Sequence, residues 1–356
     1  MVERKPVSIT VVAYVLGMRS NKLQRWYKQH LSGFVEALES GSLFEHDLDL
    51  KEEYISVPIY KPDNLGSHMA IDEKHIDGDY YTILSNKETN KIALLAQTTK
   101  SRHLVALIHS MGVDKCMNVK TVSRDLAQYY DWTCRQVFMN ALQIGDKFHV
   151  VKKVLLAAQE LRVLYKQQNL LDQKEAYDKH KAVEHCRKIE CRLKKQKYVP
   201  NRYEPKNVKL ANGETLKQVL TRSRHLLFKD KKNWTIKQKA RSEVLFEVYP
   251  ELEKVYELIQ KFRRWYSKKN INKSLYQLRK QLSNWYSQVE ALDNVYLTNA
   301  KGTVERNEGV ILNYFYEGHS NAKAETLNSH ISRFTSKTFG IRNLEFFFYR
   351  LAIYFA

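Results

Sequence analysis

Three acidic side chains, far apart along the chain, have the setting that a divalent-cation site needs. Asp72 ends a short apolar segment, residues 68–72, and Asp125 follows another predicted strand, residues 118–123, so both are predicted to lie at the ends of β-strands. Glu325 lies on a predicted helix. Because carboxylate oxygens are the ligands that Mg²⁺ and Mn²⁺ prefer, two strand-end acids and a third from a helix could hold a pair of such ions for phosphoryl chemistry.

The helix that carries Glu325 is predicted from Asn321 onward. Leu327, Ile331 and Phe334 recur at positions i, i+4 and i+7, which places them on one apolar side. The polar positions line another face of the same helix: Asn321, Glu325, Asn328 and Ser332. A single glutamate on a helix is ordinarily a solvated surface residue, so its assignment to a site depends on the two strand-end acids.

The elements around the strand-end acids predict a mixed sheet. Residues 68–72, 80–84 and 92–96 form three strands of an antiparallel meander, and two further strands, at 118–123 and 142–145, alternate with helices. This order is α/β, with helices on both faces of the sheet. A meander followed by a crossover makes the first and fourth strands neighbours, which would bring Asp72 and Asp125 together.

The middle of the chain is helical in pattern and strongly basic. Of the 59 Lys and Arg and 39 Asp and Glu, residues 151–300 hold 34 and 16, whereas residues 1–150 hold 18 of each. A long basic segment interleaved with aromatic residues is typical of binding to a phosphate backbone, although a solvated lysine-rich face is the alternative. Trp234, Trp265 and Trp285 could stack on unpaired bases or belong to the helical core.

Residues 6–34 have the pattern of a helix-turn-helix unit. Ser8 can cap a first helix, Ala13 is small at the expected crossing, Gly17 permits the turn, and Leu23 and Trp26 are predicted on the buried side of the second helix. That helix would present cations to a DNA groove or phosphate: Arg19, Lys22, Arg25 and Lys28. An ordinary helical hairpin packed on the rest of the chain is the alternative. Residues 36–66 are acidic and poorly periodic, which favours a linker.

Four separated motifs together resemble the DDE transposases of bacterial insertion sequences, specifically the ISL3 group. The motifs occur in that family's order and are Met69-Ala70-Ile71-Asp72-Glu73, Val122-Ser123-Arg124-Asp125, Gly145-Asp146-Lys147-Phe148-His149-Val150, and Ser320-Asn321 with Glu325 and Asn328, followed by Arg333 and Phe339-Gly340-Ile341-Arg342-Asn343. The resemblance implies an RNase H-like catalytic domain interrupted by a helical insertion and preceded by the helix-turn-helix.

The resemblance also implies roles for single residues. Asp72, Asp125 and Glu325 would be the catalytic triad that binds two Mg²⁺ ions, for which Mn²⁺ could substitute. Asp146 and His149 match an Asp-x-x-His element with a supporting role, and Asp146, which also follows a strand, is the rival to Asp125. The remaining residues of the motif set fall into two groups: Asn321 and Asn328 beside the site, and Arg333 and Arg342 on DNA.

These inferences divide the chain into five parts. They are a helix-turn-helix unit at 1–35, a linker at 36–66, the first part of the catalytic domain at 67–150, a basic helical insertion at 151–312, and the C-terminal catalytic helices at 313–356. The four cysteines show no Cys-x-x-Cys pattern and no apolar run approaches 18 residues, so we expect reduced thiols, no membrane span and a cytoplasmic, nucleoid-associated protein. The chain lacks the cysteine-rich zinc-binding segment that typical family members carry ahead of the helix-turn-helix.

The predicted activity is metal-dependent phosphodiester hydrolysis at the inverted-repeat ends of an insertion sequence, followed by strand transfer to target DNA. Double-stranded DNA is the predicted partner, and a homodimer is expected because two ends must be joined. A nuclease of the same fold without strand transfer, and a DNA-binding protein without catalysis, are the alternatives.

Overall fold

The computed structural model divides the chain into two compact units. Unit 1 consists of residues 1–150 and 307–356, and unit 2 of residues 151–306. The structure describes residues 8–41, 43, 46, 48–50, 53–205, 208–317, 322–337 and 343–356, with the backbone alone at 48–50, 53, 317, 322–326, 328 and 337. Each unit is treated separately below.

Unit 1 is built around a six-stranded mixed sheet with the order β3-β6-β5-β4-β7-β8. The strands are β3 Ile59–Tyr60, β4 His68–Ile76, β5 Asp79–Asn86, β6 Ile92–Ala96, β7 Thr121–Arg124 and β8 Leu142–Gly145. The predicted meander is confirmed, because β4, β5 and β6 pair antiparallel, and β7 and β8 continue the sheet in parallel. This mixed α/β arrangement is compatible with an RNase H-like fold.

The prediction that the first and fourth strands are adjacent in the sheet is also confirmed. In the parallel pair of β4 and β7, Ile71 is opposite Arg124, which is the last residue of β7. Asp72, however, lies in the middle of β4 rather than at its end, because β5 continues to pair with β4 as far as Ile76. The prediction of a strand end at Asp72 was wrong for this reason, yet Asp72 is the first residue of β4 beyond the parallel pairing.

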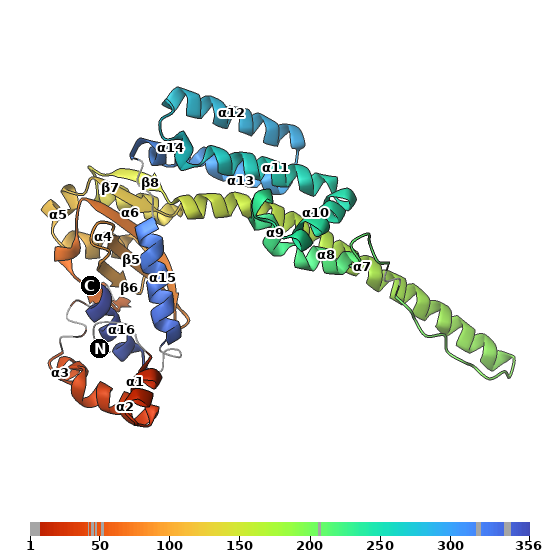
Figure 1. Ribbon diagram of the computed structural model, residues 1–356, viewed down its shortest axis with the longest axis horizontal. Helices are drawn as coiled ribbons and strands as arrows, with labels where there is room; N and C mark the ends of the chain where they lie inside the picture. The colour runs from red at the N-terminus through yellow and green to blue at the C-terminus, as the bar shows by residue number, and fades with distance from the viewer. Residues whose placement is uncertain are drawn as a thin grey trace. The chain divides into compact units, whose positions relative to one another are not determined.

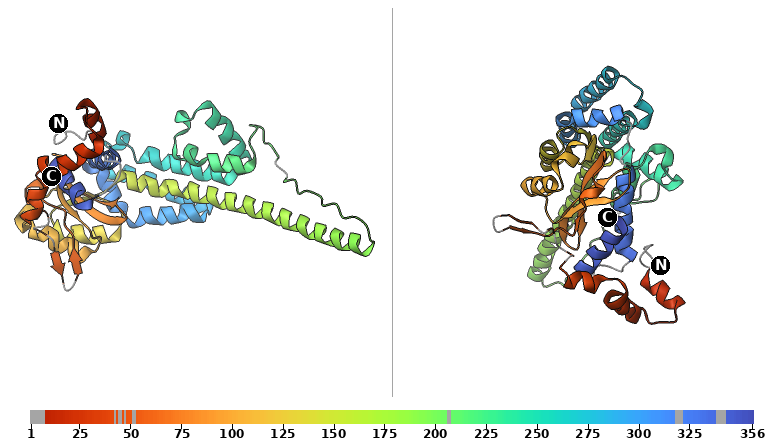
Figure 2. Two further views of the ribbon diagram at one scale, coloured as in Figure 1. Left: turned by 90° about the horizontal axis from the view of Figure 1, so that it is seen from below. Right: turned by 90° about the vertical axis from the view of Figure 1, so that its left-hand side faces the viewer.

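Helices cover both faces of the sheet. On one face, α4 (Ser101–Ser110), α5 (Val113–Met117) and α6 (Gln128–Val137) enclose a core with alternate residues of the strands, such as Met69 and Ile71. On the other face, α15 (Ala322–Lys337) and α16 (Leu344–Phe355) pack on Ile76, Tyr81 and Ile83. Figures 1 and 2 show α15 and α16 along one side of the sheet and α4 to α6 on the other.

Part of the segment expected as a linker belongs to the sheet. β3 pairs with β6 and forms one edge of the sheet, and Ile55, Val57 and Ile59 are buried in the core of unit 1. A separate two-stranded hairpin, β1 Leu48–Leu50 and β2 Glu53–Ile55, precedes them. The linker prediction was wrong for this part of the segment. It gave more weight to the surrounding acids and prolines than to three apolar residues at alternating positions.

The N-terminal hairpin forms with one change from the expectation. α1 spans Ile9–Val15, α2 spans Ser20–Trp26, a π-helical turn η1 spans Tyr27–Leu31, and α3 spans Phe34–Glu39. Ala13 and Leu23 are buried and Gly17 has a φ of +66°, but Trp26 is 49% exposed. Tyr27 is buried in its place, because it lies four residues after Leu23 and therefore on the same face of the helix. Tyr27 and Phe34 pack on Phe346 of α16.

Unit 2 is helical apart from one isolated β-bridge in its described residues. Its helices are α7 Lys147–Leu193, which begins in unit 1, α8 Leu216–Arg222, α9 Arg224–Phe228, α10 Ile236–Val248, α11 Pro250–Trp265, α12 Leu275–Leu292 and α13 Val295–Arg306. The chain re-enters unit 1 through α14, Glu308–Glu317, where the Asn313 side chain donates to the Gln143 carbonyl of β8. Within the described part of the chain, no helix is long and apolar enough to cross a membrane.

Glu214 of unit 2 offers a test of pH-dependent stability. Its carboxylate accepts two hydrogen bonds from Arg241 and one from Arg222, each at 2.7 Å. The Arg241 hydrogen bonds lower the pKa of Glu214 to about 2, although its partial burial opposes this. A depressed carboxyl pKa stabilises the fold above the unfolded value of about 4.5, and this contribution is lost as the pH falls towards 2.

We therefore expect Glu214→Gln to lower the free energy of unfolding by about 2 kcal/mol at pH 7, because it removes charge-assisted hydrogen bonds. In urea unfolding followed by circular dichroism, the difference from wild type should shrink between pH 4.5 and pH 3. Glu243→Gln, an exposed position on α10, serves as the control. A deficit that stays constant across this pH range would contradict the assignment.

Candidate active site

Asp72 and Asp125 meet where β4 and β7 cease to pair. Each acid directly follows a member of the last register pair, Ile71 opposite Arg124. The Nδ1 atom of His149 lies 3.9 Å from Oδ1 of Asp72 and 3.6 Å from Oδ1 of Asp125. One imidazole therefore touches both carboxylates, although residue 149 lies 77 and 24 positions further along the sequence, respectively.

The carboxylates of Asp72 and Asp125 are like charges that are partly withdrawn from water. Burial raises the pKa of Asp72 above its usual range, and the carboxylates of Asp146 and Asp125 add to the rise. His149 and the Glu73 N–H, which donates to Asp72 at 2.8 Å, act in the opposite direction. The Leu126 N–H similarly donates to Asp125 at 2.6 Å. An arrangement of this kind favours a cation beside the two acids.

Asp146 and His149 are held together by the start of α7. The Asp146 N–H donates to the Arg124 carbonyl at 2.7 Å, which extends the ladder between β7 and β8 by one bond. The Asp146 carboxylate accepts from the Phe148 N–H at 2.7 Å, so it caps the helix and is itself buried. His149 follows within the first turn, and its buried Nδ1 has no hydrogen-bond partner among the side chains that the structure describes.

The buried Arg124 holds the backbone beside the two acids, a structural role that sequence reasoning did not assign to it. Its side chain is 2% exposed. It donates to Gln143 of β8 at 2.6 Å, to the backbone carbonyl of Asp125 at 3.0 Å, and to Asp131 of α6. The guanidinium therefore fixes the backbone that carries Asp125. An arginine at the end of a predicted strand, with an acid seven residues later, was the signal available in the sequence.

Helix α15 is anchored to the face of β4 that carries Asp72. Lys74, two residues beyond Asp72 and hence on the same face of the strand, donates to the Ser332 hydroxyl at 2.6 Å. The apolar side predicted for this helix is confirmed, because Leu327, Ile331 and Phe334 are at most 1% exposed.

Glu325 lies in the first turn of α15, seven residues before Ser332. Seven residues are close to two helical turns, so the two positions share one side of the helix, the side that meets Lys74. The side chains of Glu325 and Asn328, and all of Asn321, lie outside the described residues. Among the described residues, no group of three or more His, Cys, Asp or Glu is arranged to hold a metal ion.

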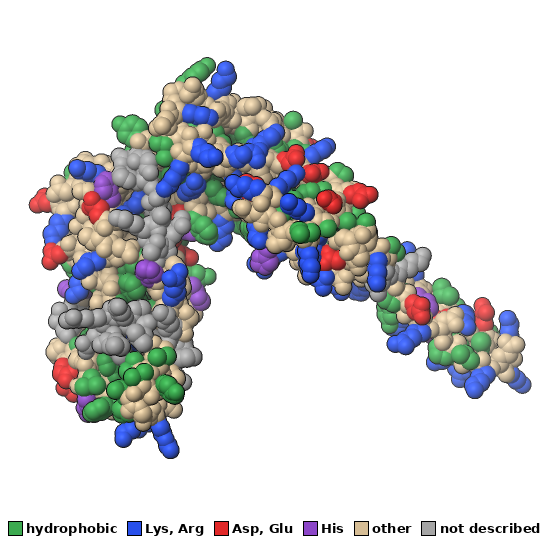
Figure 3. All heavy atoms as spheres, viewed as in Figure 1, with side chains coloured by type: hydrophobic (Ala, Val, Ile, Leu, Met, Phe, Trp, Pro, Cys, Tyr) green, Lys and Arg blue, Asp and Glu red, His purple; other side chains and the backbone are tan. Residues whose placement is uncertain are grey.

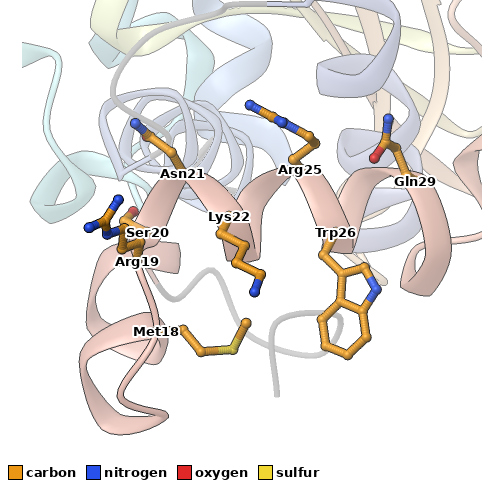
Figure 4. A pocket seen from close by; sticks show the side chains of 8 residues that line it. All are labelled: Met18, Arg19, Ser20, Asn21, Lys22, Arg25, Trp26 and Gln29. Carbon is orange, nitrogen blue, oxygen red and sulfur yellow. The ribbon is translucent and has the colours of Figure 1, made fainter.

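The cations expected to bind DNA are found in different settings. Arg19, Lys22 and Arg25 line an open groove of about 900 Å³ along α2, together with Trp26 (Figure 4). Lys28 lies instead with its ammonium 5.1 Å from the centre of the Phe34 ring. Arg333 is exposed on α15, and Arg342 lies outside the described residues.

Comparison with known protein families shows the family of the chain. Residues 69–351 match the family model DDE_Tnp_ISL3, described as transposase. The chain belongs to the ISL3 transposase family. The match begins in β4, ends in α16, and spans Asp72, Asp125, unit 2 and Glu325, whereas the N-terminal hairpin precedes it. No curated protein and no solved structure gives a significant match.

The tie between Lys74 and Ser332 can be measured in this transposase by a double-mutant cycle. We expect Lys74→Met and Ser332→Ala to show a coupling energy of about 1 kcal/mol in urea unfolding, because Lys74 is only partly exposed and the bond joins segments 258 residues apart. The control pair is Lys115 and Asp63, whose side chains are 46% and 96% exposed, for which a smaller coupling is expected. Equal coupling in both pairs would show that the tie does not anchor α15.

Proposed function

We propose that the chain is the transposase of an insertion sequence, and that Asp72, Asp125 and Glu325 catalyse phosphodiester hydrolysis at the ends of the element and strand transfer to target DNA. The observation that carries the proposal is the meeting of Asp72 and Asp125 on adjacent parallel strands, on the face that α15 covers. Because α15 is anchored to that face by Lys74 and Ser332, Glu325 is the acid on the helix best placed to complete the site.

The residues present suit divalent cations. Asp72, whose pKa is raised by burial, and the neighbouring Asp125 offer hard oxygen ligands of the kind that Mg²⁺ prefers. Asp72, Asp125 and Glu325 would hold the ions, two per site, with Mn²⁺ as a substitute. When bound, the ions would supply the charge that activates the attacking group and stabilises the leaving oxygen.

The surrounding residues position the acids. Arg124 fixes the backbone of Asp125 through its carbonyl, and Asp146 fixes the start of α7 that carries His149. We assign Asp146 to this supporting role, and Asp125 to catalysis, because the Asp146 carboxylate is engaged in capping α7 and is only 5% exposed. His149 lies between the two acids, where its ring limits how closely they approach.

End recognition is proposed for the N-terminal hairpin. Arg19, Lys22 and Arg25 line the groove along α2, as a helix that contacts a DNA groove requires. The hairpin is fixed to α16 by the Tyr349 hydroxyl, which donates to the Ser32 carbonyl at 2.7 Å. A DNA end held by α2 would thus be bound by the unit that contains the acids. A homodimer would bring the two ends together.

The acids are tested by replacing them one at a time. We expect Asp72→Asn, Asp125→Asn and Glu325→Gln each to lower Mg²⁺-dependent cleavage of element-end DNA by at least about 100-fold, with DNA binding retained, because the charge that holds the ions is lost. Asp114→Asn, on exposed α5, is the matched control. Cleavage by Glu325→Gln at the wild-type rate would end the assignment of that residue.

The same assay separates the alternatives. Full loss in Asp146→Asn with activity retained in Asp125→Asn would exchange their roles. Cleavage without joining to a target duplex would indicate a nuclease of this fold, and binding without any metal-dependent cleavage would indicate a DNA-binding protein alone.

The hairpin is tested through affinity and sequence preference. We expect Lys22→Gln combined with Arg25→Gln to weaken binding to element-end DNA at least about tenfold and to weaken binding to an unrelated duplex less, because base contacts are worth about 1–3 kcal/mol each. Lys91→Gln combined with Lys120→Gln removes the same charge from exposed positions of unit 1. Equal losses in the two double variants would argue against recognition by α2.

A further inference from the structure

Within unit 2, basic residues most clearly outnumber acidic residues in the hairpin of α11 and α12. Residues 258–289 contain eight Lys and Arg and no Asp or Glu. They cover the second half of α11, the 3₁₀ turn Lys268–Asn270, and most of α12. Figure 3 shows Lys and Arg side chains spread over the surface of this unit. This supersecondary element therefore carries eight positive charges with no acidic residue to offset them.

This hairpin has a groove of about 310 Å³ with a basic and amide rim. Lys261, Arg264 and Lys273 stand beside Gln281, Asn284 and Gln288, and no acidic side chain lines it. Elsewhere in unit 2 some cations are paired with carboxylates, as Arg241 is with Glu214 and Lys301 with Glu290. Among the ion pairs of the described residues, none includes Lys261, Arg264 or Lys273.

Neutral amides orient the lysines of the rim. Lys261 donates to the Gln288 side chain at 2.8 Å, and Gln288 in turn donates to Asn284 at 3.1 Å. Lys273 donates to the Gln281 side chain at 3.2 Å. An amide holds an ammonium in place without neutralising it, so the rim keeps its full positive charge for a ligand.

Two buried tryptophans join α11 and α12 beneath the groove. The indole N–H of Trp265 donates to the Leu278 carbonyl of α12, and that of Trp285 donates to the Leu258 carbonyl of α11, at 3.1 and 2.9 Å. Both indoles are at most 8% exposed, so the option of stacking on bases does not hold for these two residues. The Asn270 side chain donates to the Trp265 carbonyl at 2.7 Å and ties the 3₁₀ turn to the end of α11.

We propose that this groove is a second DNA-contacting surface, which holds the phosphate backbone of duplex DNA without regard to sequence. The inference rests on the proposed function, since it assumes that DNA is the substrate. Cations held by amides on a fixed scaffold suit the regularly spaced charges of a phosphate backbone. An acidic protein is disfavoured as the occupant because the two aromatic residues of the groove are buried, whereas exposed aromatic anchors are what protein interfaces use.

The salt dependence of binding tests the proposal. The full-length triple variant Lys261→Gln, Arg264→Gln and Lys273→Gln is compared with wild type on element-end DNA and on an unrelated duplex of equal length, in metal-free buffer. Each lost phosphate contact should reduce the slope of log K against log salt by about 0.9, so we expect a slope smaller by about 2 to 3. The affinity at low salt should fall on the order of tenfold, and equally for both duplexes.

A charge-matched control is available in the same unit. Lys217→Gln, Lys237→Gln and Lys239→Gln remove three exposed cations of α8 and α10 and should leave the slope nearly unchanged. An unchanged slope in the groove variant, or the same change in both triple variants, would overturn the proposal, as would a loss confined to element-end DNA. If wild type binds neither duplex, the proposed function itself fails, which is a different outcome.

Discussion

The parallel pairing of β4 with β7 is the constraint on which the site depends. Its last register pair, Ile71 with Arg124, makes Asp72 and Asp125 the first residues beyond the ladder on both strands. Parallel neighbours bring the same ends of two strands to one edge, so residues 53 positions apart are placed side by side by backbone hydrogen bonds alone. A shift of one residue would move either acid to the opposite face of the sheet.

Placing the two acids together is unfavourable for folding, and the surrounding structure limits the cost. Burial and neighbouring carboxylates raise the pKa of Asp72, so the pair is strained as long as it carries two charges. His149 and two backbone N–H groups relieve part of this strain. The buried Arg124 is compensated separately, by Asp131, so that its charge does not neutralise the acids. The negative charge that remains at Asp72 and Asp125 fits a site that binds cations.

The chain leaves unit 1 and returns to it at neighbouring places. α7 begins directly after β8, and α14, on the way back, is hydrogen-bonded to β8 through Asn313. An insertion of 156 residues can therefore be accommodated without disturbing the strand order, because its two ends are tied to the same strand. Unit 2 carries most of the basic charge, and the N-terminal hairpin carries the groove along α2, so DNA contacts and chemistry are assigned to different parts of one polypeptide.

Local pattern alone determined much of this protein. Short apolar runs separated by polar turns specified the meander, the helical spacing of Leu327, Ile331 and Phe334 specified the buried side of α15, and the ordered acidic motifs indicated the family. Tertiary structure decided what depends on partners distant in sequence. Residues 59–60 joined the sheet by pairing with β6, and Tyr27 rather than Trp26 entered the core because Phe346 of α16 packs against it. The role of Arg124 was settled in the same way, because its three partners, on β8, on α6 and in its own strand end, converge only in the folded chain.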